Sequence, residues 1–254
     1  MAVKENAYKL YPNLGYWLLT FIPLTAAGFY VTYFSRLHLP QPSVLHLHFG
    51  LMAIWMGMVI SQPLLIRNKK LQLHRKVGRM SYIILPLVLL STWMIMKWSY
   101  EVEISSLQNE LVQGTSSETL EEGRSRIASF ISIAFIYVFW LGVFYGLAIW
   151  HRKNHSIHAR FMIAASLTFL GPTVDRILIF LFGIYSIGPG LPSAVVAFIL
   201  VDSILSYLLL RDIREKKKTC PYALALGLYI PVQLFHLFLT DSPIWERTVR
   251  FLLG

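Results

Sequence analysis

The chain has 254 residues, of which 56% are hydrophobic and only 14% are charged, and its mean hydropathy is +0.56. A soluble domain carries about 25% charged residues, so this composition excludes an ordinary soluble fold and favours membrane-spanning segments. The formal net charge of +10 comes from basic residues clustered between apolar blocks, which is typical of topology signals and not of nucleic-acid binding. The single cysteine, Cys220, excludes an internal disulfide and a multi-cysteine metal site. The expected partner is therefore the lipid bilayer.

The first half of the chain is expected to cross the bilayer three times. A polar start, residues 1–12, precedes an apolar block at 13–35, which is too long for a signal peptide and is expected to remain as a span. The second block covers 46–66 and is followed by the basic segment 67–79, which has no acidic residue and is expected in the cytoplasm. The third block covers 80–98. The long polar connection 99–127 is rich in glutamate and is expected outside, with a short surface helix within it.

The second half contains four further apolar blocks, at 128–150, 159–184, 192–210 and 221–240. Basic segments follow the first and third of these blocks, and both are expected in the cytoplasm. The tail is expected outside as an interfacial helix anchored by Trp245 and Phe251. The sequence thus predicts one all-α domain over residues 1–254. This domain is a seven-span membrane helix bundle with its N-terminus inside and its C-terminus outside, in the inner (cytoplasmic) membrane of a bacterium.

Ionisable side chains within the predicted spans are costly, so they are expected to face the bundle interior and to carry the function. The orientation places five of them in the outer half of the bundle, where they are expected to line a polar cavity that binds a small ligand. They are His48, Asp175, Arg176, Asp202 and His236. Trp55 and Gln62 share the helix face of His48. Structural alternatives are an ion pair between the fifth and sixth spans, a hydrogen bond at His236 and simple packing at Trp55.

A second polar group lies at the cytoplasmic end. His74 and His158 each stand where a loop re-enters a span, so they are candidate cofactor ligands, with Gln62 as a neighbour. His151 and His155 fit a solvated basic rim that touches anionic lipid headgroups.

Several of these residues together resemble a known family. The histidine, tryptophan and glutamine of the second span are followed by H-R-x-x-G, here His74-Arg75-Lys76-Val77-Gly78. This pattern resembles an uncharacterised bacterial family of multi-pass membrane proteins. That family also carries H-x-R-x-M at a later span and an arginine at its far end, similar to His158-Ala159-Arg160-Phe161-Met162 and Arg176 here. The resemblance covers residues 46–180 and implies a fold and a set of positions, but no activity, because the family is one of unknown function.

Three classes of function are compatible with these residues. The first, which we favour, is a non-enzymatic binding or transport protein, in which Arg176 meets an anion and Asp202 or His236 relays protons. The second is a haem b protein that transfers electrons, because facing imidazoles are the usual axial ligands in a helical bundle. Its ligand pairs would be His48 with His236 outside and His74 with His158 inside.

The third class is a zinc-dependent membrane hydrolase acting on lipid amides. Its metal ligands would be His48, His236 and Asp202 or Asp175, with the remaining position left for an activated water. The last span lacks the H-x-x-x-H of comparable seven-span hydrolases, because the residue four before His236 is Val232. A retinal protein is excluded, since no predicted span holds a buried lysine for its Schiff base.

Overall fold

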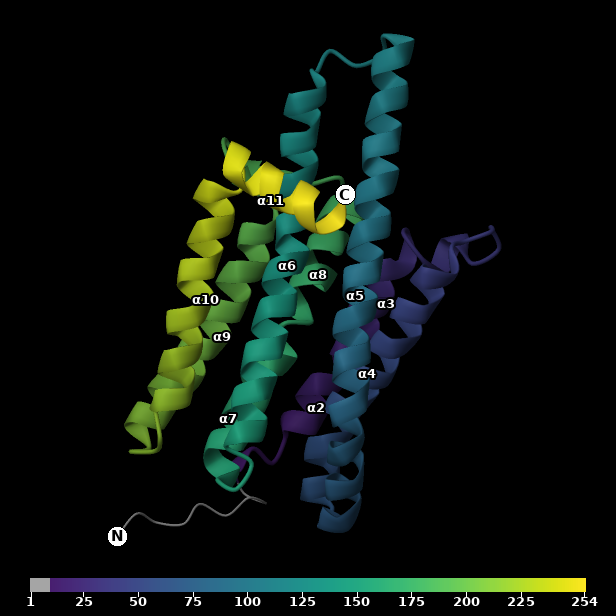
Figure 1. The fold of residues 1–254 in the computed structure, drawn as a ribbon. Coiled ribbons are helices and arrows are strands. Elements are labelled where there is room, and N and C mark those ends of the chain that lie inside the picture. Colours follow the sequence, from purple (N-terminus) through teal and green to yellow (C-terminus); the bar gives the residue numbers. More distant parts are fainter. Residues whose placement is uncertain (1–9) are drawn as a thin grey trace.

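The computed structural model describes residues 10–254, and the polar segment expected in the cytoplasm before residue 10 lies outside the described residues. The described chain is almost entirely helical (Figure 1). Its elements are α2 (Leu14–Leu19), α3 (Phe21–Tyr30), the 3₁₀ turn η1 (Phe34–Arg36), α4 (Ser43–Arg67), α5 (Leu71–Gln113), α6 (Leu120–Trp150), α7 (His155–Leu167), α8 (Leu170–Arg176), the π-helical turn η2 (Ile177–Leu181), β1 (Ser186–Gly188), β2 (Leu191–Pro192), α9 (Ala194–Arg214), α10 (Cys220–Leu239) and α11 (Pro243–Leu253). The strands β1 and β2 pair antiparallel on either side of Pro189 and Gly190.

Within the described chain, six helical segments are long and apolar enough to cross a membrane. They are α4, α5, α6, the composite segment His155–Leu181, α9 and α10. Each coincides with one of the apolar blocks from 46–66 onward. The chain is therefore an all-α integral membrane protein.

The first apolar block, 13–35, is not one long helix. It is divided into α2 and α3, and its apolar helical stretch, Leu14–Tyr30, is shorter than the six spans. Pro23 explains the division, because proline has no N–H to donate to the carbonyl of residue 19. The Thr20 hydroxyl instead donates to the carbonyl of Trp17 at 2.6 Å. Helix α3, the second half of this block, packs tightly against α8, since a Cβ at Gly28 would lie 2.7 Å from the carbonyl oxygen of Thr173.

The spans pack around α6 and the segment His155–Leu181. Of the six spans, this segment is the most buried, and α6 contacts α5, α7, α10 and α11 (Figure 1). Large aromatic side chains fill the centre of the bundle. The ring of Tyr229 lies 4.1 Å from that of Trp140 and 5.1 Å from that of Phe144.

The turns after α4, α6 and α9 all lie at the same end of the bundle, which we call the basic end (Figure 1). Two of these turns close through lysines in the left-handed backbone region, Lys69 (φ 58°) and Lys216 (φ 51°). We call the opposite end, with the α5–α6 turn, the acidic end.

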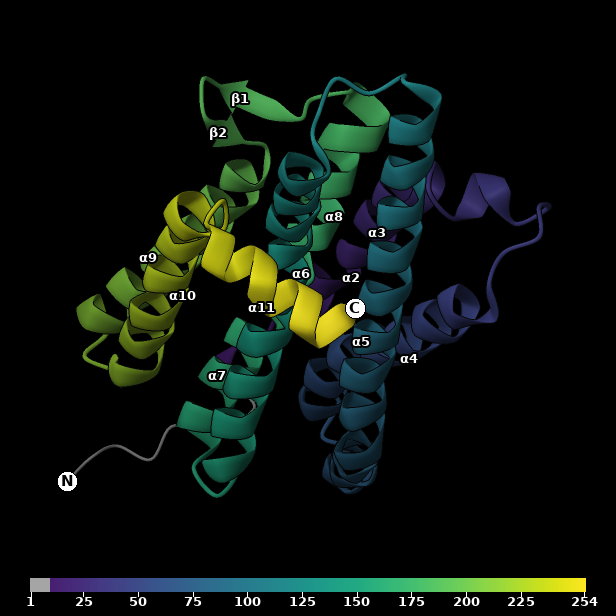
Figure 2. The same cartoon turned by 45° about the horizontal axis from the view of Figure 1, so that its top comes forward.

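The predicted length of the polar connection, residues 99–127, is wrong, because the connection between the two helices is much shorter. Helix α5 continues from the membrane to Gln113 and α6 begins at Leu120, so only residues 114–119 form the turn. Gly114 ends α5 with φ 67°, and Thr119 with Glu122 forms a capping box at the start of α6. The resulting α5–α6 hairpin rises beyond the level of α11 (Figure 2).

The expected tail helix is present as α11, which crosses α6 and α5 at the acidic end (Figure 2). Its Val249 and Leu253 join Met96, Tyr100 and Leu107 in a second, smaller core. Trp245 is not a lipid anchor but an internal contact, because its indole nitrogen donates to the carbonyl of Ala128 at 3.0 Å.

Candidate functional site

Arg176 ends α8 and stands at the edge of the bundle interior, between α3 and η2. Its guanidinium lies 4.7 Å from the ring centre of Phe29 and 5.7 Å from that of Phe180. One nitrogen donates a long hydrogen bond of 3.4 Å to the Thr32 hydroxyl. Within residues 10–254, Arg176 forms no ion pair. Two aromatic faces and one hydroxyl are therefore its direct contacts in the described chain, and Asp175 interacts with it through charge alone.

Asp175 does not neutralise Arg176 by direct contact, although the two are adjacent in sequence. Successive residues of a helix point about 100° apart. Asp175 is buried, and its charge interacts with the phenol of Tyr137 on α6. One Asp175 carboxylate oxygen and the Tyr137 hydroxyl are buried without a hydrogen-bond partner among the described residues.

His48 lies on α4 near Arg176. Its Nδ1 is 3.1 Å from the Ser91 hydroxyl of α5, and its ring is close enough to Arg176 for their charges to interact. The structure thus brings His48 and Arg176, two of the predicted outer residues, into one region of the bundle.

His236 and Asp202 make interhelical hydrogen bonds elsewhere. The Nδ1 of His236 is 2.7 Å from the Ser132 hydroxyl of α6, and the Gln233 amide donates to Asp202 at 3.0 Å. Asp202 is therefore not the ion-pair partner of Arg176 that the sequence allowed. The hydrogen-bond alternative for His236 is the one the structure shows.

The outer residues do not assemble into a metal site. No three histidine, cysteine, aspartate or glutamate side chains of the described chain come together as a metal-binding group. His48 and His236 instead bond to serines of different helices, and no hydrogen bond or charge interaction joins the two imidazoles. The described chain therefore does not bring the expected zinc ligands together, and the outer haem pair stays a prediction.

Two hollows of the surface lie at the basic end. One, of about 450 Å³, is lined by Lys69, Lys70, Leu71, Gln72, Leu73 and Lys76. The other, of about 140 Å³, is lined by Tyr207, Leu210, Arg211 and Arg214. Neither contains any of the residues expected to line the outer cavity.

The two inner histidines stand on different helices at the basic end. His74 lies in the first turn of α5 and His158 in the first turn of α7, and their charges interact. The Nδ1 of His158 lies 2.8 Å from the carbonyl oxygen of Ala148. The Gln62 amide donates to the main-chain carbonyl of His74 at 3.3 Å. The His74 Nδ1 and the Gln62 Oε1 are buried without a hydrogen-bond partner in the described chain.

Trp55 serves the core of the bundle. It is buried, and its ring packs edge-on against Tyr145 at 5.6 Å. The Tyr145 hydroxyl lies 2.6 Å from that of Ser81 on α5. This agrees with the packing alternative for Trp55.

A buried ion pair at the basic end escaped the sequence analysis. The Arg160 Nε of α7 donates to the Asp212 carboxylate of α9 at 2.6 Å, and both side chains are fully buried. A second Arg160 nitrogen donates to the Ser156 carbonyl at 3.0 Å. The signal was present in the sequence, because Asp212 is an acid between two arginines at the end of an apolar block.

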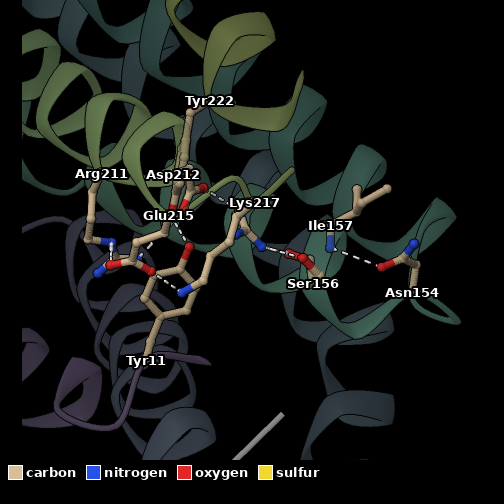
Figure 3. Close-up of polar contacts among 10 residues, drawn as sticks. Tyr11, Asn154, Ser156, Ile157, Arg211, Asp212, Glu215, Lys217 and Tyr222 are labelled. Carbon is tan, nitrogen blue, oxygen red and sulfur yellow. Dashed lines mark hydrogen bonds and ion pairs between the residues drawn. The ribbon is translucent and has the colours of Figure 1, made fainter. Parts of the chain in front are cut away.

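Tyr11 and Tyr222 lie next to Asp212 (Figure 3), and their ring centres are 5.8 Å and 5.9 Å from the Arg160 guanidinium. The Tyr222 hydroxyl donates to the hydroxyl of Tyr11 at 2.8 Å, and the Arg211 guanidinium lies 4.9 Å from the Tyr11 ring centre. Burial raises the pKa of the Tyr11 phenol, so it remains protonated at neutral pH. The cluster joins the start of the described chain to α7, α9 and α10.

These features define an α-helical integral membrane protein whose interior contains several distinct polar groups. Comparison with protein-family models, with curated proteins and with solved structures finds no match in any of the three. This agrees with the resemblance to a membrane family of unknown function.

Proposed function

We propose that this protein is a seven-span membrane protein of a bacterial inner membrane that binds a small anionic ligand at Arg176 and His48, between α3, α4 and α8. The observation that carries the proposal is a guanidinium within a span that contacts aromatic rings but has no carboxylate at ion-pair distance in the described chain. Transport of this anion is the natural extension of binding.

The proposed topology places this site in the outer half of the membrane. The turns after α4, α6 and α9 carry basic residues and share one end of the bundle. The positive-inside rule assigns that end to the cytoplasm. Arg176 and His48 lie toward the acidic end, which then faces outward. The broken segment formed by α2 and α3 is the seventh crossing, so the N-terminus is inside and the C-terminus outside.

The chemistry of the guanidinium favours an anion. Arginine has five N–H donors and stays charged, so its burial at membrane depth demands compensation. The faces of Phe29 and Phe180 attract the cation but accept few of its hydrogen bonds. A carboxylate or a phosphate would accept two of the remaining donors at once. The nearby His48 imidazole offers one further polar contact.

Ligand binding to the detergent-purified protein tests this proposal. The probes are dodecanoate, dodecyl phosphate and inorganic phosphate, with dodecyltrimethylammonium as a cationic amphiphile of similar tail. We expect one or more of the anions, but not the cation, to raise the melting temperature in a saturable manner. Arg176→Gln should abolish the shift, and Arg176→Lys should weaken the affinity on the order of tenfold, because lysine cannot bind bidentately.

Arg36→Gln provides the matched control, since Arg36 lies in η1 at the same end of the molecule. It should retain the full thermal shift. An anion-induced shift that survives in Arg176→Gln would contradict the proposal. Flux of the same anion into proteoliposomes then separates a transporter from a binding protein.

A further inference from the structure

We infer that His74 and His158 are the two axial ligands of a haem-type cofactor at the basic end of the bundle. This site is separate from the Arg176 region and does not depend on the function proposed above.

The hydrogen bond of His158 prepares its ring for a metal. A carbonyl oxygen can only accept, so the contact of 2.8 Å with Ala148 requires that Nδ1 carries the proton. The Nε2 of neutral His158 then holds the free electron pair. Metal-ligating histidines almost always donate their other N–H to a carbonyl or carboxylate in this way.

His74 supplies the second imidazole from a different helix. Its main chain is fixed by the Gln62 amide, whereas its Nδ1 is buried without a hydrogen-bond partner among residues 10–254. A buried polar atom in this state normally has a partner, so a ligand is a natural explanation. Helix α6 packs against both α5 and α7, which are not themselves among the closely packed helix pairs. The two imidazoles therefore stand on different helices that both pack against α6, and they are close enough for their charges to interact.

The number of ligands selects the class of cofactor. A zinc site needs at least three protein ligands, and no such group of histidine, cysteine, aspartate or glutamate is present in the described chain. Haem iron needs only the two axial positions, because the macrocycle occupies the other four. Two histidines from separate helices of a bundle meet this requirement.

The basic end also provides cations for the two propionates of a haem. Arg75 is close enough to His74 for their charges to interact, and Arg79 follows one turn later. Arg152, in the turn that precedes α7, donates to the Tyr82 hydroxyl of α5 at 2.8 Å. Arginine and carboxylate form strong charge-assisted hydrogen bonds, so these residues suit the polar edge of the macrocycle.

Absorption spectroscopy of the full-length protein from haem-replete cells tests the inference. The purified protein, and the same protein after titration with hemin, should show a Soret band and a sharp α-band on reduction, at one haem per chain. His74→Ala and His158→Ala should each remove at least nine-tenths of the bound haem. His151→Ala is the matched control, because His151 lies in the same turn but stacks on Phe161, and it should keep the spectrum.

Misfolding is separated from loss of a ligand by His158→Gly, in which added imidazole should restore the band. A wild-type protein that stays colourless even after hemin titration overturns the inference, as does a band that persists in either alanine variant. Arg176→Gln should bind haem normally, so failure here and failure of the anion site are distinguishable.

Discussion

Single residues at the basic end link three helices through buried charge. The Arg160–Asp212 pair is shielded from water by Tyr11 and Tyr222. Removing one partner leaves the other charge buried, so Asp212→Ala should lower the free energy of unfolding by about 3–5 kcal/mol. Denaturant unfolding in detergent measures this, with the exposed Lys153→Ala as a control expected near zero. The double variant Arg160→Met with Asp212→Leu removes both charges and should be more stable than Asp212→Ala. If it is not, the loss of stability in Asp212→Ala does not come from the unpaired charge of Arg160.

Gly171 is a residue at which a single methyl group has a large predicted effect. Its Cβ would lie 1.8 Å from the Tyr137 hydroxyl, on a ring that is almost fully buried. Gly171→Ala should therefore destabilise the protein by about 2 kcal/mol through overpacking. Thermal unfolding in detergent should show that Gly171→Ala lowers the melting temperature much less in a protein that also carries Tyr137→Ala. Purely additive effects would mean that the two residues do not touch.

The sequence identified most of the residues discussed here but not their pairing. His74 and His158 were predicted as a pair because both re-enter a span from the same side. The pairings of Asp202 and His236 were not predictable, because they depend on how helices rotate against one another. Asp212 lies at the start of the basic segment that follows the sixth apolar block, and its position next to arginines does not reveal which way its side chain points. Only the packing of α7 against α10, and of α10 against α9, shows that it faces inward.

At the scale of single elements, Trp245 adds an aromatic contact to those of the buried Val249 and Leu253, which fix α11 to the bundle. Trp245 donates to Ala128 and packs edge-on against Phe135 and Phe235 at 5.6 and 5.4 Å. Trp245→Ala should loosen the start of α11, because no other aromatic ring of this helix packs inward; amide exchange over residues 243–248 should become faster. Phe251→Ala is the control, since that ring is 87% exposed, and unchanged exchange in Trp245→Ala would contradict this account.

The turn between α9 and α10 contains an ion pair that depends on pH. The Lys217 ammonium, which bonds to the Glu215 carboxylate, holds the pKa of that carboxyl below its usual value. A lowered folded-state pKa contributes stability above the unfolded pKa, and this contribution is lost as the pH falls through the folded value. Glu215→Gln should therefore lower the melting temperature slightly at pH 7 and not at pH 3. Because Glu215 is exposed, high salt should also remove the difference.

Hydropathy predicted the elements within the membrane well and those outside it poorly. All six apolar blocks from 46–66 onward are helices, because a span must satisfy its backbone internally. The connection 99–127 was read as a loop because it is polar. Within this connection, the helical part is marked by a narrow row of apolar residues on one helix face. These residues, Ile104, Leu107 and Leu111, pack on α6 and α11. The first block divides at Thr20, three residues before Pro23, and hydropathy alone does not show this break.

At the scale of the whole molecule, the native Cys220 can report the topology. It is exposed at the start of α10, at the basic end. In intact cells a membrane-impermeant maleimide should not label it, whereas inside-out vesicles should be labelled. Cys220→Ser with Ser116→Cys moves the thiol to the α5–α6 turn and should reverse the pattern. Labelling of Cys220 from outside the cell would invert the proposed orientation.

The α5–α6 hairpin makes this small protein accessible to electron cryomicroscopy. A chain of 29.2 kDa that lies mostly within a detergent micelle offers few features for particle alignment. Helix α5 has 43 residues and thus extends about 64 Å, roughly twice the hydrocarbon thickness of a bilayer. Its far end is joined to α6 by a short turn at 114–119 and braced by α11. Replacing that turn with a soluble helical-bundle domain, fused through both helices, would give the particle a rigid fiducial outside the micelle.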